Sequence, residues 1–233
     1  MTDMIAYFCK KKEGRFWAKT DPFCPLFTPF LRISIPAGYP AFALRRRVKW
    51  LEKRGIRRYI ADRELFPPKD LEVYGLKEVD PLPLCRAKAA QLALALLPQA
   101  PHLCRVSIGG ERVDQTAIAL AEALCPQVGT LYLDFDRGGE DLALHLRAAF
   151  GAAPQPPGHT PHLAVELSPR KPLGERTLRL WGEPDLLGLS LTVPGGLPSR
   201  PDPLRHLTIL WESGRCALSQ ISVCPAGEET GNP

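Results

Sequence analysis

Two adjacent glycines, Gly109 and Gly110, stand where a dinucleotide-binding fold would keep its phosphate-binding turn. They follow a strand-like segment, 103–108, and precede a helix-like segment, 113–124. In such a unit, glycines let the backbone approach a pyrophosphate, and the helix N-terminus contributes free N–H groups. The spacing Gly-x-Gly-x-x-Gly is missing, however, and Glu111 would place a negative charge beside a phosphate. The glycines therefore indicate a strand–turn–helix unit more strongly than a bound nucleotide.

A nucleotide at this turn would need further contacts. Arg112 could offset the charge of Glu111, and two acids follow at the end of the next strand-like segment, close to the position of a ribose-binding carboxylate. The candidate cofactor-binding set is thus Gly109, Gly110, Arg112, Asp134 and Asp136. The competing interpretation is a tight turn followed by solvated aspartates.

A basic segment at 43–54 offers a different chemistry, the binding of anions. Its apolar residues Leu44, Val48 and Leu51 recur at helical spacing. The other faces of this helix would carry Arg45, Arg46, Arg47, Lys49, Trp50, Lys53 and Arg54. Such a surface suits the phosphates and bases of a nucleic acid, and it equally suits an acidic protein surface or an anionic lipid. The alternative is a solvated helix face on which Trp50 stacks against an arginine.

Metal, redox and nucleophilic chemistry have little support. His159 and His162 frame a proline, but no cluster of Cys, Asp or Glu adjoins them, and the seven cysteines form no Cys-x-x-Cys pair. Walker-type and Gly-x-Ser-x-Gly motifs are missing. Glu166 is a single carboxylate at the end of a strand-like segment, where α/β enzymes place functional groups. We therefore assign no catalytic residue, no metal ligand and no cofactor.

Charge is unevenly distributed along the chain. Residues 1–65 hold 15 Lys and Arg against 6 Asp and Glu, whereas residues 66–233 hold 15 against 19. This asymmetry points to an anionic partner for the front, or to attraction between front and back. The chain lacks an apolar run long enough for a membrane helix, and its start lacks the pattern of a signal peptide, so we expect a cytoplasmic protein.

The elements that must position these residues follow from periodicity. In the central part, strands at 103–108, 130–135 and 163–167 alternate with helices at 113–124 and 140–150. This alternation implies parallel strands joined by right-handed crossovers. In the front part we expect a β-hairpin over 4–19, a helix at 43–54, a strand at 56–61 and a helix near 84–97. The last third predicts further strands and a helix capped by Asp202 with Pro203 at its first position.

The predicted fold is α/β with three layers: a mostly parallel Rossmann-like sheet, an N-terminal β-hairpin and antiparallel additions near the C-terminus. We divide the chain into a basic N-terminal α/β region (1–97), a Rossmann-like region (98–225) and a flexible tail (226–233). Because fold alone does not set function, two hypotheses stay open. The first is a non-catalytic or degenerate Rossmann-like interaction protein whose basic helix faces an anionic partner. The second is an enzyme that binds a nucleotide or small metabolite at 109–112.

Overall fold

The chain forms two compact units, one from residues 1–80 and 193–220 and the other from 81–192 and 221–233. The computed structural model describes residues 4–10, 18–36, 39–62, 69–156, 158–171, 174 and 176–226. These units differ from the predicted division after residue 97. Helix α4 (Ala89–Leu96), predicted in the front region, belongs to the second unit because its apolar stripe packs on that unit's helix α5 and strand β8.

The first unit is built on a mixed five-stranded sheet with the order β2-β3-β1-β4-β5. Its strands are β1 (Ile5–Lys10), β2 (Lys19–Phe23), β3 (Phe30–Ile35), β4 (Arg58–Ala61) and β5 (Lys77–Glu78). β1 is parallel to β3 and β4, β5 is parallel to β4, and only the β2–β3 pair of this sheet is antiparallel. Its α-helices are α1 (Ala41–Glu52), α2 (Lys69–Glu72) and α7 (Pro203–Glu212).

The predicted N-terminal hairpin is wrong in its pairing. β1 and β2 follow one another in the chain, but β3 lies between them in the sheet. Five of the six residues of β1 are buried, which is typical of a central strand covered on both faces, whereas β2 is a partly exposed edge strand. Alternation around a charged segment identified two strands but could not identify the partner of each. The charged turn predicted at 10–14 lies, apart from Lys10, outside the described residues.

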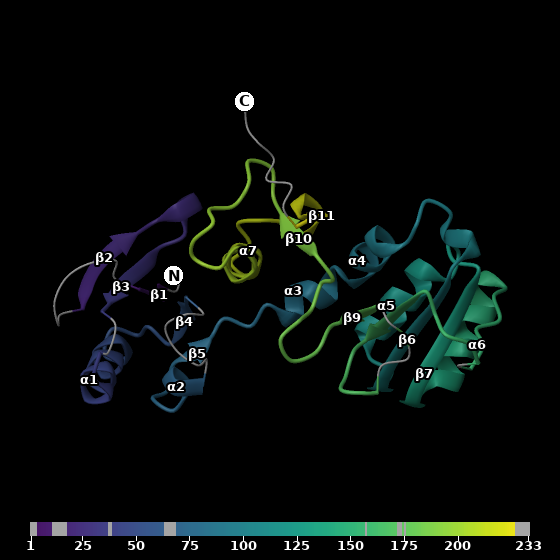
Figure 1. Ribbon diagram of the computed structural model, residues 1–233, viewed down its shortest axis with the longest axis horizontal. Coiled ribbons are helices and arrows are strands. Elements are labelled where there is room, and N and C mark those ends of the chain that lie inside the picture. Colours follow the sequence, from purple (N-terminus) through teal and green to yellow (C-terminus); the bar gives the residue numbers. More distant parts are fainter. Residues whose placement is uncertain are drawn as a thin grey trace. The chain divides into compact units, whose positions relative to one another are not determined.

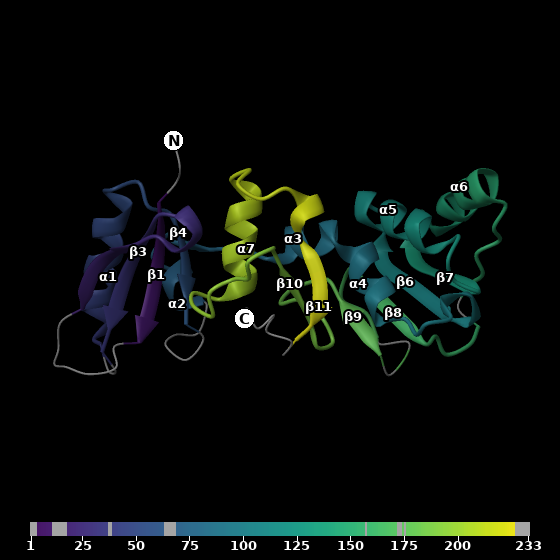
Figure 2. The ribbon, with the colours of Figure 1, turned by 90° about the horizontal axis from the view of Figure 1, so that it is seen from above.

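Both faces of this sheet are covered, so the first unit has three layers (Figures 1 and 2). On one face, Phe8 of β1 belongs to a cluster with the apolar stripe of α1. On the other face, Tyr7 and Phe30 pack in a cluster with Ile209 of α7. α7 begins as predicted, because the Asp202 carboxylate accepts a hydrogen bond from the backbone N–H of Arg205. A helix from the last third of the chain thus completes the layer opposite α1.

The second unit contains a parallel four-stranded sheet with the order β7-β6-β8-β9. Its strands are β6 (Arg105–Arg112), β7 (Thr130–Arg137), β8 (Leu163–Glu166) and β9 (Thr177–Arg179). Its other helices are α3 (Leu82–Ala87), α5 (Gln115–Leu124) and α6 (Gly139–Phe150). β7 lies on one side of β6 and β8 on the other, the reversal typical of doubly wound sheets. The residues at the centre of β6 and throughout β8 are buried, as the predicted layering requires.

Strands β10 (Leu189–Thr192) and β11 (Ser222–Pro225) form the antiparallel addition near the C-terminus. They make a separate two-stranded sheet and do not extend the parallel one. Single 3-10 turns occur at Pro25–Phe27, Pro101–Leu103 and Leu218–Gln220. The predicted tail, apart from residue 226, lies outside the described residues. Within the described ranges, no helix combines the length and apolar character needed to cross a bilayer.

Candidate anion-binding site on helix α1

Gly109 and Gly110 lie inside strand β6 and do not form a turn. β6 continues to Arg112, and it stays paired with β7 as far as Arg137. A Cβ atom at Gly109 would lie 3.2 Å from the backbone oxygen of Asp134, so the close approach of β7 accounts for a glycine here. The prediction of a phosphate-type turn at 109–112 is therefore wrong, because the segment is extended and hydrogen-bonded within the sheet.

The N-terminus of α5, where a phosphate would bind in a dinucleotide fold, already holds a carboxylate of the protein. Asp114 caps this helix by accepting a 2.9 Å hydrogen bond from the N–H of Ala117. The other Asp114 oxygen lies 3.3 Å from Nη1 of Arg86. Arg86 also donates to the carbonyls of Leu167 and Leu180, at 2.5 and 3.1 Å. Arg86 thus joins the start of α5 to the ends of β8 and β9.

The two candidate ribose-binding acids converge on an arginine that sequence reasoning did not identify. Nη2 of Arg170 lies 2.7 Å from the Asp136 carboxylate and 3.5 Å from that of Asp134. Nη1 donates to the carbonyl of Gly110 at 2.9 Å, and it also contacts the Asp134 carbonyl. The structure therefore brings Gly110, Asp134 and Asp136 together around a guanidinium of the chain itself. Arg112 is exposed and lies beside Arg137 on the neighbouring strand.

These contacts join the segment after β8 to the carboxyl ends of β6 and β7, the edge where doubly wound sheets bind their ligands. The hydroxyl of Ser168, two residues after the end of β8, accepts a 2.7 Å hydrogen bond from the N–H of Glu111 in β6. Glu166 ends β8 as expected, but it is buried, and its carboxylate accepts a 3.3 Å hydrogen bond from the indole N–H of Trp181. The protein's own side chains thus occupy much of this edge.

Helix α1 presents the predicted basic face. Leu44, Val48 and Leu51 are buried, and this burial turns the remaining sides of the helix outward. Arg47 is half-buried, and the other five basic residues are exposed: Arg45, Arg46 and Lys49 on α1, and Lys53 and Arg54 directly after it. Within the described part of the chain, no carboxylate forms an ion pair with any of the six. α1 therefore carries a local excess of positive charge that the described residues do not neutralise.

Trp50 packs against two of these guanidinium groups. The Cζ atom of Arg54 lies 3.9 Å from the centroid of the indole ring, and that of Arg47 lies 5.2 Å from it. Arg47 also donates a 3.3 Å hydrogen bond to the carbonyl of Ala18. The predicted stacking of Trp50 on an arginine is confirmed. The indole consequently orients Arg47 and Arg54 along the helix surface.

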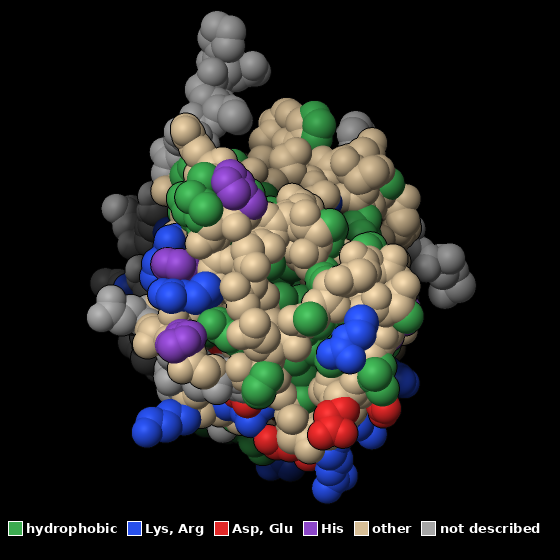
Figure 3. All heavy atoms as spheres, turned by 90° about the vertical axis from the view of Figure 1, so that its right-hand side faces the viewer, with side chains coloured by type: hydrophobic (Ala, Val, Ile, Leu, Met, Phe, Trp, Pro, Cys, Tyr) green, Lys and Arg blue, Asp and Glu red, His purple; other side chains and the backbone are tan. Residues whose placement is uncertain are grey.

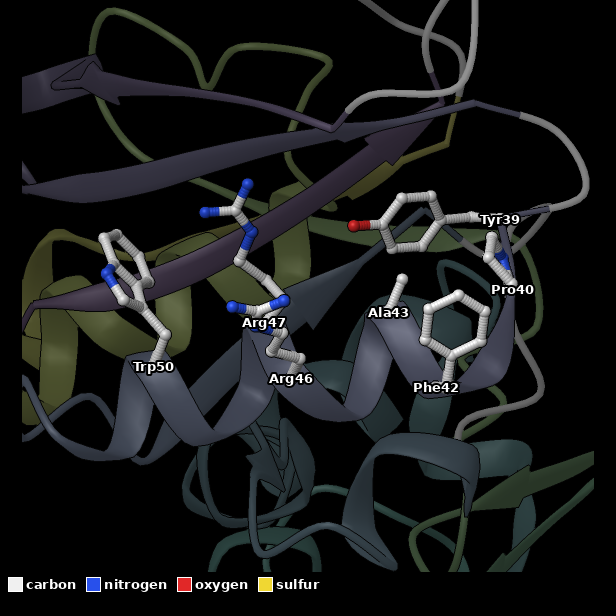
Figure 4. A pocket seen from close by; sticks show the side chains of 7 residues that line it. All are labelled: Tyr39, Pro40, Phe42, Ala43, Arg46, Arg47 and Trp50. Atoms are coloured by element: carbon white, nitrogen blue, oxygen red, sulfur yellow. The ribbon is translucent and has the colours of Figure 1, made fainter.

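A pocket of about 560 Å³ lies along α1, from its N-cap residue Pro40 to Trp50. It is lined by Tyr39, Pro40, Phe42, Ala43, Arg46, Arg47 and Trp50. In Figure 4 the rings of Tyr39 and Phe42 lie at one end, the ring of Trp50 lies at the other, and the two arginines stand between them. Phe42 is 78% exposed, although most large aromatic side chains are buried. Tyr39 and Phe42 escaped sequence analysis because they precede the predicted helix and flank Pro40.

The start of α1 adds to the positive potential of this pocket. Pro40 occupies the N-cap position, and it supplies no side-chain acceptor for the first-turn N–H groups. The first turn also contains no acidic residue. By contrast, α5 and α7 are capped by Asp114 and Asp202. The positive end of the α1 dipole therefore reinforces the neighbouring arginines.

The second unit offers a surface of different character. Figure 3 shows the side that carries α6 and β7, where basic atoms are scattered among hydrophobic, acidic and uncharged ones, and histidines lie along one edge. A smaller pocket of about 410 Å³ lies between α5 and α6. Its lining includes Glu122 and His145, whose side chains lie 2.7 Å apart, together with Asp141. This mixed lining gives no preference for an anion.

The chain as a whole shows little similarity to known proteins. No protein-family model matches it, and no curated protein matches it in sequence. Among solved structures, the crystal structure of L-tryptophan dehydrogenase from Nostoc punctiforme is similar, with 12% identity and a TM-score of 0.31. The match covers 70% of this chain and 56% of that chain, so it extends over little more than half of the dehydrogenase. A likeness at this level carries no information about activity.

Proposed function

We propose that this chain is a non-catalytic, Rossmann-like interaction protein that binds an anionic partner through helix α1. The observation that carries the proposal is the set of six basic side chains on α1 and directly after it that lack a described carboxylate partner. The uncapped start of the same helix and the arginine-lined pocket beside it favour the same kind of partner. Positive charge concentrated in this way attracts polyanions and accelerates their association.

The alternative, an enzyme that binds a nucleotide or small metabolite near 109–112, has less support. It requires room for a phosphate at the start of α5 and free acids for a ribose. Asp114 and Arg86 occupy the start of α5. Arg170 pairs with both candidate ribose-binding acids, Asp134 and Asp136. A ligand there would have to displace these contacts, all of which involve charged groups and most of which are partly buried.

The proposal is tested by measuring the binding of fluorescein-labelled heparin by anisotropy at increasing salt. We expect binding at about 50 mM salt that weakens steeply by about 200 mM, because association releases counterions. Charge reversal at Arg45, Arg46 and Lys49 should abolish binding. The matched control reverses three exposed basic residues of the second unit, Arg112, Arg137 and Arg147, and should bind much as the unaltered protein does. Equal losses in both variants, or no binding at low salt, would overturn the proposal.

A further inference from the structure

We infer that the pocket beside α1 binds single-stranded nucleic acid, with unpaired bases against Tyr39 and Phe42 and phosphates against the basic side chains of α1. This inference rests on the proposed function, because it names the anion that the same surface would take. The positive charge of α1 alone would attract any polyanion and would not distinguish one kind from another. The aromatic rings at the end of the pocket make the choice more specific, because the flat faces of bases stack on them.

The pocket combines the two features that single-strand binding requires. Phe42 exposes 78% of its surface at the second position of α1, and the ring of Tyr39 lies beside it in Figure 4. Both rings face the same hollow as Arg46 and Arg47. Base stacking on exposed rings is worth enough that one aromatic substitution weakens binding between about fivefold and a hundredfold. The volume of about 560 Å³ falls within the range of small-molecule pockets and can take a planar base.

Trp50 has a different role in this arrangement. Its ring is engaged by the guanidinium groups of Arg47 and Arg54, at 5.2 and 3.9 Å. It is therefore a positioning residue, which holds two cations where a backbone phosphate would pass. It lies eight positions after Phe42, which corresponds to about 12 Å along a helix. The cations thus continue along the helix from the rings, as they must if a strand is to lie with its bases at one end of the pocket and its backbone along α1.

The geometry disfavours the other polyanions. In a duplex the base faces are stacked on one another, so Tyr39 and Phe42 would have no base to contact. An acidic protein surface or a bilayer of anionic lipid would use the cations of α1 without requiring a planar partner at the rings. The distinguishing property is therefore the dependence of affinity on Phe42, which carries no charge.

The experiment compares fluorescein-labelled oligo(U), a mixed-sequence duplex of equal length, heparin, and vesicles of phosphatidylcholine and phosphatidylserine. We expect oligo(U) to bind at least about tenfold more tightly than the duplex at equal salt. Phe42→Ala should weaken oligo(U) binding by about tenfold and leave heparin binding unchanged. Phe150→Ala is the matched control, because Phe150 is an exposed aromatic of α6 in the second unit, and it should change neither. Circular dichroism confirms that both variants fold.

Every other outcome contradicts the single-strand inference, and one of them also contradicts the proposed function. If heparin binds through α1 but oligo(U) binds no more tightly than the duplex, the single-strand inference fails and the proposed function stands. The same holds if Phe42→Ala weakens heparin and oligo(U) equally. Vesicle binding that depends on Phe42, without oligo(U) binding, would assign the pocket to a membrane surface. If none of the polyanions binds, the inference and the proposed function fail together.

Discussion

Acidification should destabilise the first unit through one buried histidine. His206 of α7 is fully buried, its ring packs edge-on against Phe30 at 5.3 Å, and its Nε2 lies 3.3 Å from the hydroxyl of Thr28. Burial lowers the pKa of His206 to about 4, and a hydrogen bond with the backbone of Pro25 opposes the shift only partly. The folded protein therefore keeps this imidazole neutral at pH values where an unfolded chain protonates it.

The sign and size of the effect follow from the difference between the two pKa values. The unfolded value is 6.5 and the folded value is about 4, so the unfolded state binds more protons between these limits. The stability that the neutral histidine contributes is complete above about pH 6.5 and is lost as the pH falls toward the folded pKa. Each pH unit in this window costs about 1.4 kcal/mol, which gives about 2 kcal/mol at pH 5 and about 3 kcal/mol at pH 4.

Urea unfolding at about pH 7.5 and about pH 5, followed by circular dichroism, measures this loss. His206→Gln should remove most of the pH dependence, and the control His145→Gln, at an exposed position of α6, should preserve it. Because two units can unfold separately, the transition to follow is the one that His206→Gln shifts. An imidazole resonance of His206 that titrates near pH 6.5 in the folded protein would refute the reasoning, as would equal pH dependence in all three proteins.

Two further substitutions test the contacts that close the second unit. A Cβ atom at Gly129 would collide with the backbone oxygen of His102, so Gly129→Ala should cost more than about 2 kcal/mol of unfolding free energy, while Gly158→Ala, with ordinary spacing, should cost under about 0.5 kcal/mol. Similar urea midpoints for these two variants would contradict the structure. Arg170→Met should cost about 2–3 kcal/mol of unfolding free energy, measured by urea unfolding, because it leaves partly buried Asp134 without its cation. A neutral effect would mean that Arg170 is dispensable.

The parallel sheet of the second unit could be predicted because its signals are local. Helical periodicity in 140–150 and a short apolar run such as 163–167 require no knowledge of distant residues. Strand pairing is different, since β1 has β3 and β4 as neighbours, and nothing within residues 4–19 specifies that choice. The prediction of a turn at Gly109 and Gly110 fails for the same reason. Charged residues follow them, but β7 extends equally far and keeps β6 hydrogen-bonded.

The residues of the candidate site also fall into two groups, those that the local sequence could identify and those that it could not. The cations of α1 could be identified because the buried stripe of Leu44, Val48 and Leu51 determines which side faces outward. The pocket required coordinates, since Tyr39 precedes a proline and helix propensity gives no reason to group it with Trp50. Arg170 was also beyond sequence reasoning. It comes from an irregular segment, and its contacts with β6 and β7 depend on how the chain returns after β8.

The position of α7 in the chain sets an order of events during synthesis. The strands of the first unit are complete by residue 78, but the face of the sheet that carries Tyr7 and Phe30 is covered by a helix at 203–212. At usual elongation rates of about 5–20 residues per second, the ribosome needs about 7–27 s to make the chain from residue 78 to the end of α7. Throughout this interval α7 does not yet cover the apolar face of the first unit's sheet. The ribosome synthesises all strands of the parallel sheet of the second unit during the same time. A nascent chain arrested before residue 203 should therefore recruit chaperones far more strongly than one released at full length.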